Sequence, residues 1–148
     1  MKRAYRKQAN TLTPHEAAYL AGFVDGEGCI TARLRRGGVD GDMEIASVMR
    51  EQLVRLQEET GVGSVRAKRI RNKKAKQIHV WNISLCSLGS LLVQLLPYLR
   101  LKKKQAELML VLTSYEYPFR LDDQRQTDIV GQFRVLNRRG VETFSAFN

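Results

Sequence analysis

Length, composition and charge limit the classes of protein that fit this sequence. The chain has 148 residues, enough for a single domain with a hydrophobic core. It carries 25 Lys and Arg against 15 Asp and Glu, a formal net charge of +10, and 43% of its residues are hydrophobic. That hydrophobic fraction excludes a disordered basic tail, and the charge favours a polyanionic partner, nucleic acid first. Basic ribosomal and membrane-surface proteins carry similar charge.

The sequence contains no candidate membrane span and no secretion signal. No apolar run is long enough to cross a bilayer, and the N-terminus lacks a signal-peptide pattern, so we expect an intracellular protein without a membrane partner. The two cysteines, Cys29 and Cys86, lie far apart within apolar patterns, and His15 and His79 are isolated. This distribution argues against a disulfide framework and against a transition-metal cluster.

A short tail and then a helix are expected to open the chain. Residues 1–10 are polar and basic, typical of a flexible tail that contacts phosphate non-specifically, and residues 11–148 form a single domain. Thr13 fits an N-cap, Pro14 fits the first helical position, and Glu16 completes a capping box. These residues predict the start of a helix.

The two faces of this helix differ in the size of their side chains. The small face carries Ala18, Ala21, Gly22 and Asp25, and the bulky face carries Leu20, Phe23 and Val24. The bulky face belongs in a core, whereas small residues allow another backbone to approach closely. We therefore predict that a second copy of this helix packs on the small face, which makes the protein a homodimer.

Two carboxylates, Asp25 and Glu27, lie at the expected helix end, separated by Gly26 and followed by Gly28. Negative charge at a helix C-terminus opposes the macrodipole by about 0.3–1 kcal/mol per exposed group, so a cation is expected there. A divalent metal held by oxygen ligands would offset the repulsion, and the glycines leave backbone carbonyls accessible. The simpler interpretation is an acidic helix end in water.

A first hairpin is expected after this helix. Residues 29–36 alternate as in a half-buried strand, residues 37–41 predict a glycine-rich turn, and residues 43–48 predict the returning strand. The outward face of the first strand carries Arg33 and Arg35. This strand therefore presents a basic face.

The returning strand carries carboxylates on its outward face, Asp42 and Glu44. On a DNA-facing sheet such groups are useful only where they accept a hydrogen bond from a cytosine amino group. An amphipathic helix is predicted over residues 50–60, and Gly61 ends it as a C-cap.

A second hairpin is expected next. Residues 64–71 alternate, residues 72–76 form a lysine-rich tip, and residues 77–85 form the returning strand. In that strand the apolar phase changes between Val80 and Trp81. The change predicts either a bulge or burial on both faces.

Further helices complete the predicted chain. Ser87 fits the cap of a leucine-rich helix that ends before Pro97, and another helix is expected over residues 102–115. Residues 122–139 carry one more expected helix. Its apolar stripe consists of Ile129, Phe133 and Leu136.

This order of elements predicts an α+β fold with an αββαββα core. Both hairpins would join one antiparallel sheet with helices on one face and basic residues on the other. A β-ribbon fits the DNA major groove, where arginine is the best reader of guanine. The candidate DNA-binding residues are Arg33, Arg35, Arg66, Lys68, Gln77 and His79. The alternative is that the strand arginines are simply solvated.

The segment from Leu20 to Gly28, LAGFVDGEG, resembles the signature of the LAGLIDADG homing endonucleases position for position, with Glu27 as the final acidic residue. The segments GVGSVR (61–66) and LRLKKKQA (99–106) are similar to segments at the corresponding places in intron-encoded members. The resemblance extends from about Leu12 to Leu112. It is closest to the single-motif, homodimeric branch.

This resemblance implies a fold and an activity. The fold is an αββαββα core whose antiparallel sheet forms a DNA-binding saddle, with helices on the other face. The activity is a site-specific, divalent-metal-dependent DNA endonuclease that hydrolyses phosphodiesters. As a homodimer it makes a staggered double-strand cut in a long, near-palindromic target. The implied cofactor is Mg²⁺, with Mn²⁺ or Ca²⁺ able to occupy the site, and the implied location is a chloroplast, a mitochondrion or a prokaryotic cytoplasm.

The resemblance also implies roles for particular residues. Glu27 would coordinate the metal near the scissile phosphate with help from the Gly26 carbonyl. Asp25 matches the first acidic position of the motif. We count it with the catalytic residues and expect it mainly to support the dimer interface. Lys102 matches a family lysine whose ammonium stabilises charge on the reacting phosphate. The alternative for Lys102 is one more solvated lysine in a basic run.

The sequence departs from the family pattern at two polar positions. Relatives place a Gln and an Arg one helical turn apart after the second strand, and aligned through Gly61 these positions fall on Ile45 and Met49. Arg50 or Gln52 would take over if the register differs. The alternative function is therefore a non-cleaving relative, either an intron maturase that folds RNA or a transcription regulator. A generic basic RNA-binding protein would leave the paired carboxylates unexplained.

Overall fold

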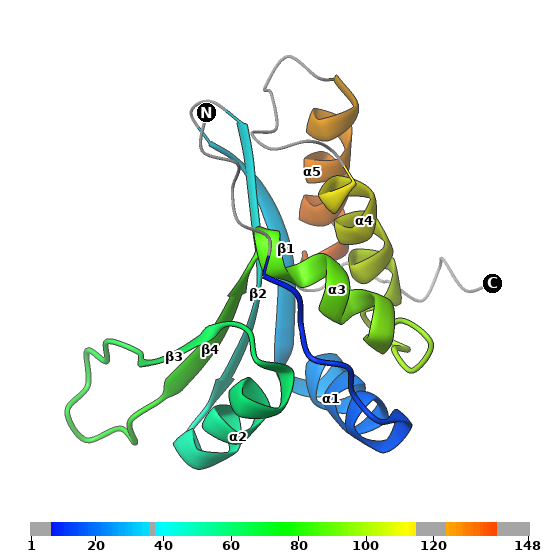
Figure 1. The fold of residues 1–148 in the computed structure, drawn as a ribbon. Coiled ribbons are helices and arrows are strands. Elements are labelled where there is room, and N and C mark those ends of the chain that lie inside the picture. Colours follow the sequence, from blue (N-terminus) through cyan, green and yellow to red (C-terminus); the bar gives the residue numbers. More distant parts are fainter. Residues whose placement is uncertain (1–6, 36–37, 115–123, 139–148) are drawn as a thin grey trace.

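The computed structural model describes residues 7–35, 38–114 and 124–138. Within these ranges the chain forms an α+β fold in which the predicted αββαββα core is followed by two more helices (Figure 1). The elements in chain order are α1 (Pro14–Glu27), β1 (Gly28–Arg35), β2 (Gly38–Ser47), α2 (Arg50–Thr60), β3 (Ser64–Ala67), β4 (His79–Ser84), α3 (Leu85–Leu95), α4 (Lys103–Thr113) and α5 (Gln124–Leu136).

The four described strands form one antiparallel sheet in the order β1-β2-β4-β3. The helices lie on one side of this sheet, and no described element covers the other side, here called the open face (Figure 1). Side chains alternate between the two faces along each strand. Residues that face the helices are fully buried, among them Ile30, Met43, Ile45, Trp81 and Ile83. The predicted fold class is confirmed.

The start of α1 agrees with its predicted capping box. The Thr13 hydroxyl accepts from the Glu16 backbone N–H at 3.2 Å, and the Glu16 carboxylate accepts from the Thr13 N–H at 2.8 Å. The helix ends at Gly28, where a Cβ atom would lie 2.7 Å from the Val24 carbonyl oxygen. The chain therefore needs glycine at the point where α1 turns directly into β1.

The first hairpin is tighter than predicted. Residues 38–41, expected in the turn, belong to β2, and Gly38 pairs with Arg35. At Gly41 a Cβ atom would lie 3.1 Å from the Met109 side chain of α4. This glycine marks close packing of a helix on the strand rather than a turn, while residues 36 and 37 lie outside the described ranges.

The second hairpin has shorter strands and a longer connection than predicted. β3 ends at Ala67 and β4 begins at His79, so residues 68–78 form a connection, here called the hairpin loop, that projects from the body in Figure 1. The pairing of β4 contains no bulge, and Val80 and Trp81 are both buried. Burial on both faces of β4 therefore explains the phase change in the sequence.

The ends of the helices agree with the sequence in part. α2 ends at Gly61, whose φ of 70° is left-handed, as predicted. α3 begins after Ser84 rather than at Ser87, because Leu85 already packs in the core. α4 and α5 lie within their predicted ranges, although residues 115 and 122–123 and residue 139 fall outside the described part.

The N-terminal segment is attached to the body before residue 10. The Ala9 N–H donates to Ser90 at 2.8 Å, and the Asn10 N–H donates to the Thr60 carbonyl at 2.8 Å. The predicted tail is therefore shorter than ten residues, and residues 1–6 lie outside the described ranges. Cys29 and Cys86 are free thiols, and both are exposed. No described helix has the length and apolar character needed to span a membrane.

Candidate active site and nucleic-acid interface

The C-terminal end of α1 brings together three of the predicted catalytic residues. The Asp25 carboxylate accepts three backbone N–H groups from the segment before α4, those of Arg100 at 2.8 Å, Leu101 at 3.1 Å and Lys102 at 3.0 Å. Three such bonds satisfy most of the accepting capacity of one carboxylate. Asp25 therefore joins the end of α1 to the start of α4 within one chain.

Lys102 supplies the cation that the sequence analysis expected at this helix end. Its ammonium donates to the Asp25 backbone carbonyl at 2.6 Å, in the last turn of α1, which contains no basic residue of its own. A positive charge at this position offsets the negative end of the helix dipole. Because an ammonium has three N–H donors, two remain for another acceptor.

Glu27, the last residue of α1, is exposed. No hydrogen bond or ion pair involves its carboxylate in the part of the chain that the structure describes. No group of three or more His, Cys, Asp or Glu side chains that could hold a metal ion occurs there either. An unpaired carboxylate beside the Gly26 carbonyl is an oxygen-donor set that suits a hard divalent cation, so these residues fit Mg²⁺, with further ligands supplied from outside the chain.

The exposed face of α1 carries part of the predicted dimer contact. Ala18 and Gly22 are exposed, and a Cβ atom built on Gly22 or Gly26 would meet nothing within 4 Å. Ala21 is fully buried, because the inward stripe of the helix runs through Ala17, Leu20, Ala21 and Val24. The assignment of Ala21 to the outward face is therefore wrong, and a narrower stripe remains open.

The open face of the sheet carries the predicted arginines, each opposite a carboxylate. Arg33 Nη2 donates to Asp42 Oδ2 at 2.9 Å, and Arg33 Nε lies 3.6 Å from Asp40 Oδ2. Arg35 Nε lies 4.0 Å from the same Asp40 oxygen. On this face the arginines are paired rather than simply solvated.

The pKa values of two groups on this face are raised. Burial acts to lower the pKa of Arg33, but the charges and hydrogen bonds of Asp42 and Asp40 outweigh it, so the guanidinium stays charged. Although the residue is exposed, partial burial of its thiol raises the pKa of Cys29, and the nearby Asp42 and Glu44 carboxylates raise it further against the opposing Lys102 charge. The pKa of Cys29 therefore responds both to charges on the open face and to the Lys102 charge at the end of α1.

The second hairpin contributes some of its predicted residues to the open face. Arg66 Nη2 donates to Glu44 Oε1 at 3.4 Å, and Lys68 follows two residues later at the exposed start of the hairpin loop. His79 instead pairs with Ala67 and has the strand phase of Trp81, which faces the helices. The prediction of His79 as an open-face residue is therefore wrong. The amide of Gln77 donates to the Lys68 and Ile78 carbonyls, both at 2.8 Å, and so closes the loop.

Sequence reasoning missed Asn82, which lies between the two outward carboxylates. Its Nδ2 donates to Asp42 Oδ2 at 3.0 Å and to Glu44 Oε1 at 3.1 Å. The missed signal was the period of two in β4, because a strand whose inward residues are Trp81 and Ile83 must turn Asn82 outward. The paired network, as we call it, consists of Arg33, Asp42, Asn82, Glu44 and Arg66.

The positions aligned with the family Gln and Arg lie in different environments. Ile45 is fully buried beside Trp81, whereas Met49 is 62% exposed. The amide of Gln52 donates to the Tyr19 hydroxyl at 2.9 Å, so this side chain is held against α1. None of these contacts reproduces a polar pair beside Glu27.

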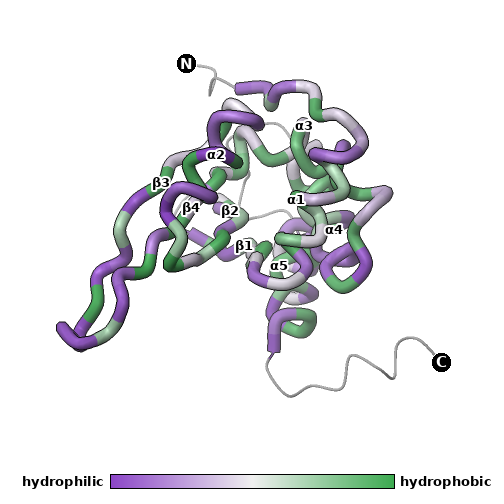
Figure 2. The backbone as a smooth tube through the Cα atoms, turned by 90° about the horizontal axis from the view of Figure 1, so that it is seen from below, coloured by the Kyte–Doolittle hydropathy of each residue, from purple (hydrophilic) through white to green (hydrophobic). Residues whose placement is uncertain are grey.

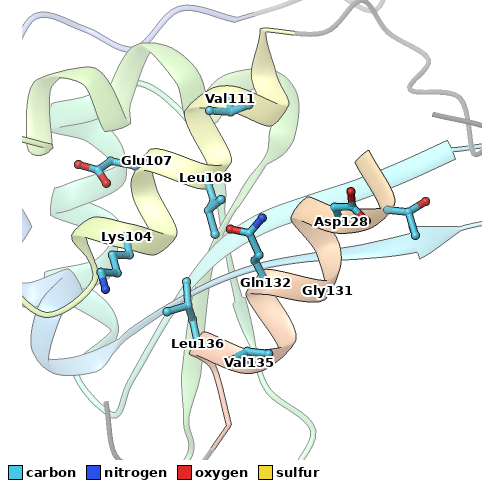
Figure 3. Close-up of a pocket in the computed structure, with 10 residues that line it drawn as sticks. Lys104, Glu107, Leu108, Val111, Asp128, Gly131, Gln132, Val135 and Leu136 are labelled. Carbon is cyan, nitrogen blue, oxygen red and sulfur yellow. The ribbon is translucent and has the colours of Figure 1, made fainter. Parts of the chain in front are cut away.

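A hollow among the described residues lies elsewhere, between α4 and α5 (Figure 3). It has a volume of about 950 Å³, and its apolar lining includes Leu108, Val111 and Val135. None of the predicted site residues lines it. The candidate site is therefore the end of α1 together with the open face of the sheet.

Comparison with known proteins gives matches among solved structures. No protein-family model matches the chain, and no curated protein does. The homing endonuclease I-CvuI, in complex with the I-CreI target in the presence of Mg and with the DNA not cleaved, is 25% identical. That match covers 88% of this chain and 88% of that chain, with a TM-score of 0.65. With its own target and Ca, I-CvuI is 26% identical over 87% of this chain and 85% of that one, also with a TM-score of 0.65.

An archaeal structure shares the same fold at lower identity. The intron-encoded homing endonuclease I-Vdi141I, complexed with DNA, is 16% identical over 87% of this chain and 88% of that chain, with a TM-score of 0.67. The solved structures that the chain matches are LAGLIDADG homing endonucleases, including the single-motif proteins I-CvuI, I-Vdi141I and I-CeuI. The LAGFVDGEG segment at the end of α1 and this shared fold make the chain similar to the LAGLIDADG homing endonucleases.

Proposed function

We propose that the protein is a site-specific homing endonuclease that acts as a homodimer and makes a staggered double-strand cut in a long, near-palindromic DNA. The observation that carries this proposal is the end of α1, where the unpaired carboxylate of Glu27 lies at the same helix end as the Lys102 ammonium. A carboxylate without a partner among the described residues is suited to a metal ion, and an ammonium with two remaining donors is suited to a phosphate.

The homodimer follows from one motif per chain. Each chain supplies one Glu27, and cutting two strands needs two such carboxylates. The open stripe of α1, with Ala18, Gly22 and Gly26, allows a second α1 to approach closely, because no described residue comes within 4 Å of a Cβ atom built on either glycine. Two chains would together carry a formal charge of 2 × 10 = +20, which favours a polyanionic substrate.

Three residues have distinct roles in the proposed hydrolysis. A Mg²⁺ held by Glu27 and the Gly26 carbonyl would supply a Lewis acid that lowers the pKa of bound water and stabilises the leaving oxygen. Lys102 donates hydrogen bonds to the phosphate as negative charge increases on it. Asp25 acts indirectly, because its three hydrogen bonds to backbone N–H groups hold the segment that carries Lys102 against α1.

The open face of the sheet is the proposed DNA-binding surface. I-CvuI and I-Vdi141I were solved with DNA, and here the open face carries Arg33, Arg35 and Arg66 next to the basic hairpin loop. Figure 2 shows the hairpin loop as a largely hydrophilic projection beside the sheet. Arginines on strands reach base edges in the major groove, and loop lysines reach phosphates.

A second candidate function is a non-cleaving nucleic-acid-binding protein on the same fold, an intron maturase or a transcription regulator. The observation in its favour is the pair of apolar side chains at Ile45 and Met49, where relatives carry a Gln and an Arg. Ile45 is fully buried. It therefore cannot organise water around Glu27, so catalysis would depend on Arg50, on Gln52 or on neither.

The deciding experiment is a cleavage selection against a library of randomised targets in the presence of Mg²⁺. We expect the protein to cut a near-palindromic class of sites, and Glu27→Gln to reduce cutting by about 10³-fold or more because it removes the metal-binding charge. Glu58→Gln is the matched control, since Glu58 is an exposed carboxylate on α2 whose loss should leave cutting unchanged.

The outcomes separate the two candidate functions. Cutting that continues in EDTA or in Glu27→Gln would contradict the metal-dependent mechanism. Enrichment of bound targets without any cutting would favour the non-cleaving alternative. Selected targets whose two halves have the same sequence would support the homodimer, because a two-fold symmetric protein reads each half of its target in the same way.

A further inference from the structure

The paired network crosses the whole open face of the sheet. Arg33 lies on β1, Asp42 and Glu44 on β2, Asn82 on β4 and Arg66 on β3, so every strand contributes at least one member. Each member is bonded to the next at 2.9–3.4 Å. An unbroken series of side-chain hydrogen bonds across four strands is a specific arrangement rather than a scatter of surface ion pairs.

Asn82 is the centre of this arrangement. Its Nδ2 nitrogen has two hydrogens, and its two acceptors are carboxylate oxygens of different residues, Asp42 and Glu44. Because ionised carboxylates only accept, the amide has one orientation that satisfies both. Asn82 also separates two negative charges on the same face of one strand that would otherwise repel each other.

Arg66 reaches its partner over an intervening strand. Glu44 lies on β2, whereas Arg66 lies on β3, and β4 runs between them. Two inter-strand spacings amount to about 9–10 Å, so the Arg66 side chain must run along the sheet surface and across β4, diagonally from its own partner Val80 toward Asn82, the partner of Glu44. Its 3.4 Å bond to Glu44 is therefore made in the place where Asn82 holds that carboxylate.

The network adds little to the stability of the fold. The Arg33 and Arg66 side chains are 40% and 58% exposed, and exposed ion pairs contribute about 0–1 kcal/mol each. Carboxylates on a surface that faces DNA phosphates also reduce affinity, since like charges repel. What the arrangement does provide is a fixed direction for two guanidinium groups.

We propose that Asn82 is a positioning residue which, through Asp42 and Glu44, holds Arg33 and Arg66 in place to read bases in the major groove. This inference rests on the proposed function, because it assigns specificity to the DNA-binding face. A guanidinium has five N–H donors, so one bond to a carboxylate leaves donors for the O6 and N7 atoms of guanine.

Base reading is the use that fits a paired arginine. The carboxylate partner already balances most of the charge of a paired arginine. Such an arginine therefore gains less binding free energy from a phosphate than an unpaired arginine does. Two donors held in one plane instead match the two acceptors of guanine, and fixing them beforehand reduces the entropy lost on binding. The network therefore predicts selectivity at the base pairs beneath Arg33 and Arg66.

The test compares Asn82→Ala with Ser64→Ala. Ser64 lies opposite Asn82 on β3, is exposed and has the same outward phase, so its replacement is a matched loss of one small polar side chain. The first readout uses the full chain without DNA and measures the ¹⁵N order parameters of the arginine Nε–Hε groups. We expect those of Arg33 and Arg66 to fall in Asn82→Ala, toward the values of Arg69 and Arg71 in the hairpin loop, and to stay unchanged in Ser64→Ala.

The second readout is the base preference of each variant in a binding selection from randomised DNA. Asn82→Ala should lose about tenfold in discrimination at the base pairs that Arg33→Lys and Arg66→Lys also affect, with unchanged affinity for non-specific DNA. The variant changes no charge, so a purely electrostatic role would leave both quantities as they are.

Each result decides the proposal. Loss of order together with loss of discrimination supports it. Unchanged order parameters in Asn82→Ala overturn the network, and loss of order with unchanged base preference overturns its role in reading. If the unaltered protein selects no sequence at all, the proposed function fails first, and the inference fails with it. That result is distinguishable because it occurs without any substitution.

Discussion

The open face of the sheet and the hairpin loop are both rich in positive charge, but they hold it in opposite ways. On the sheet, Arg33, Arg35 and Arg66 are opposed by three carboxylates of β2, so the formal charges of the paired residues cancel. In the hairpin loop, residues 68–78 contain six Lys and Arg and no acidic residue, and all six are exposed. Within the described chain no ion pair involves them.

The difference separates two properties of a DNA-binding surface. Unpaired lysines on a projecting loop bind phosphates of any sequence and supply affinity that depends on salt. Paired arginines on a rigid sheet contribute little net charge but present fixed donors to base edges. We therefore expect the hairpin loop to set how tightly DNA is bound and the sheet to set which DNA is bound.

The largest effect on selectivity is expected from Arg33→Lys. This change keeps the positive charge but removes the planar pair of donors, so discrimination at one base pair should fall by about 1–3 kcal/mol, or about 5- to 150-fold. A binding selection on randomised DNA, followed by titrations at several salt concentrations, measures both quantities. The salt dependence should remain that of the unaltered protein, and a change in salt slope without a change in preference would reverse the division of roles.

The next largest effect is expected from Lys73→Ala combined with Lys74→Ala in the hairpin loop. The slope of log K against log salt should decrease in magnitude by about 1.8, since each phosphate contact contributes about 0.9, and affinity at low salt should fall by about tenfold. The matched control is Arg134→Ala on α5 with Arg138→Ala just after it, two exposed cations outside the hairpin loop. Fluorescence anisotropy titrations should show equal base preference in all three proteins, and an altered preference in the loop variant would argue against this account.

The smallest effect is a pH shift at Cys29. Its pKa is raised above the ordinary value of 9.0, first by burial and then by Asp42, so the folded state favours the neutral thiol. The resulting contribution to stability is complete below pH 9 and is lost as the pH rises through the raised pKa. In a Cys86→Ser background, alkylation by iodoacetamide followed by mass spectrometry should reach its half-maximal rate above the pH expected for a free cysteine.

Asp42→Asn sharpens that measurement, because it removes one of the charges that raise the pKa of Cys29. The midpoint of the alkylation profile should move down toward the ordinary value in this variant. An alkylation midpoint at or below the ordinary cysteine pKa in the parent protein would show that Asp42 and Glu44 do not raise the pKa of Cys29.

The sequence predicted local structure well where one signal acted alone. The Thr13 and Glu16 capping box and the left-handed Gly61 both follow from short-range rules, and both are confirmed. The turn of the first hairpin was wrong because the glycines at 38 and 41 were interpreted as turn residues. At Gly41 the reason for glycine is the side chain of Met109, a contact 68 positions away in the sequence that no local pattern reveals.

The site was predicted as a set of residues but not as a set of contacts. The family resemblance placed Asp25, Glu27 and Lys102 in one region, yet the bonds of Asp25 to three backbone N–H groups depend on how the 100–102 segment meets α1. The burial of Ala21 and the inward phase of His79 likewise depend on which neighbours cover a face. Periodicity assigns residues to faces, and tertiary packing decides what each face meets.

The central claim is that each chain contributes one Glu27 to the cutting of one DNA strand. The most direct test is a mixed dimer, isolated with two different affinity tags, in which one chain is unaltered and the other carries Glu27→Gln. On a supercoiled plasmid with one target site and Mg²⁺, we predict that this dimer nicks a single strand and accumulates open circles, whereas the unaltered dimer produces linear DNA. Linear DNA from the mixed dimer at the rate of the unaltered one would contradict the account.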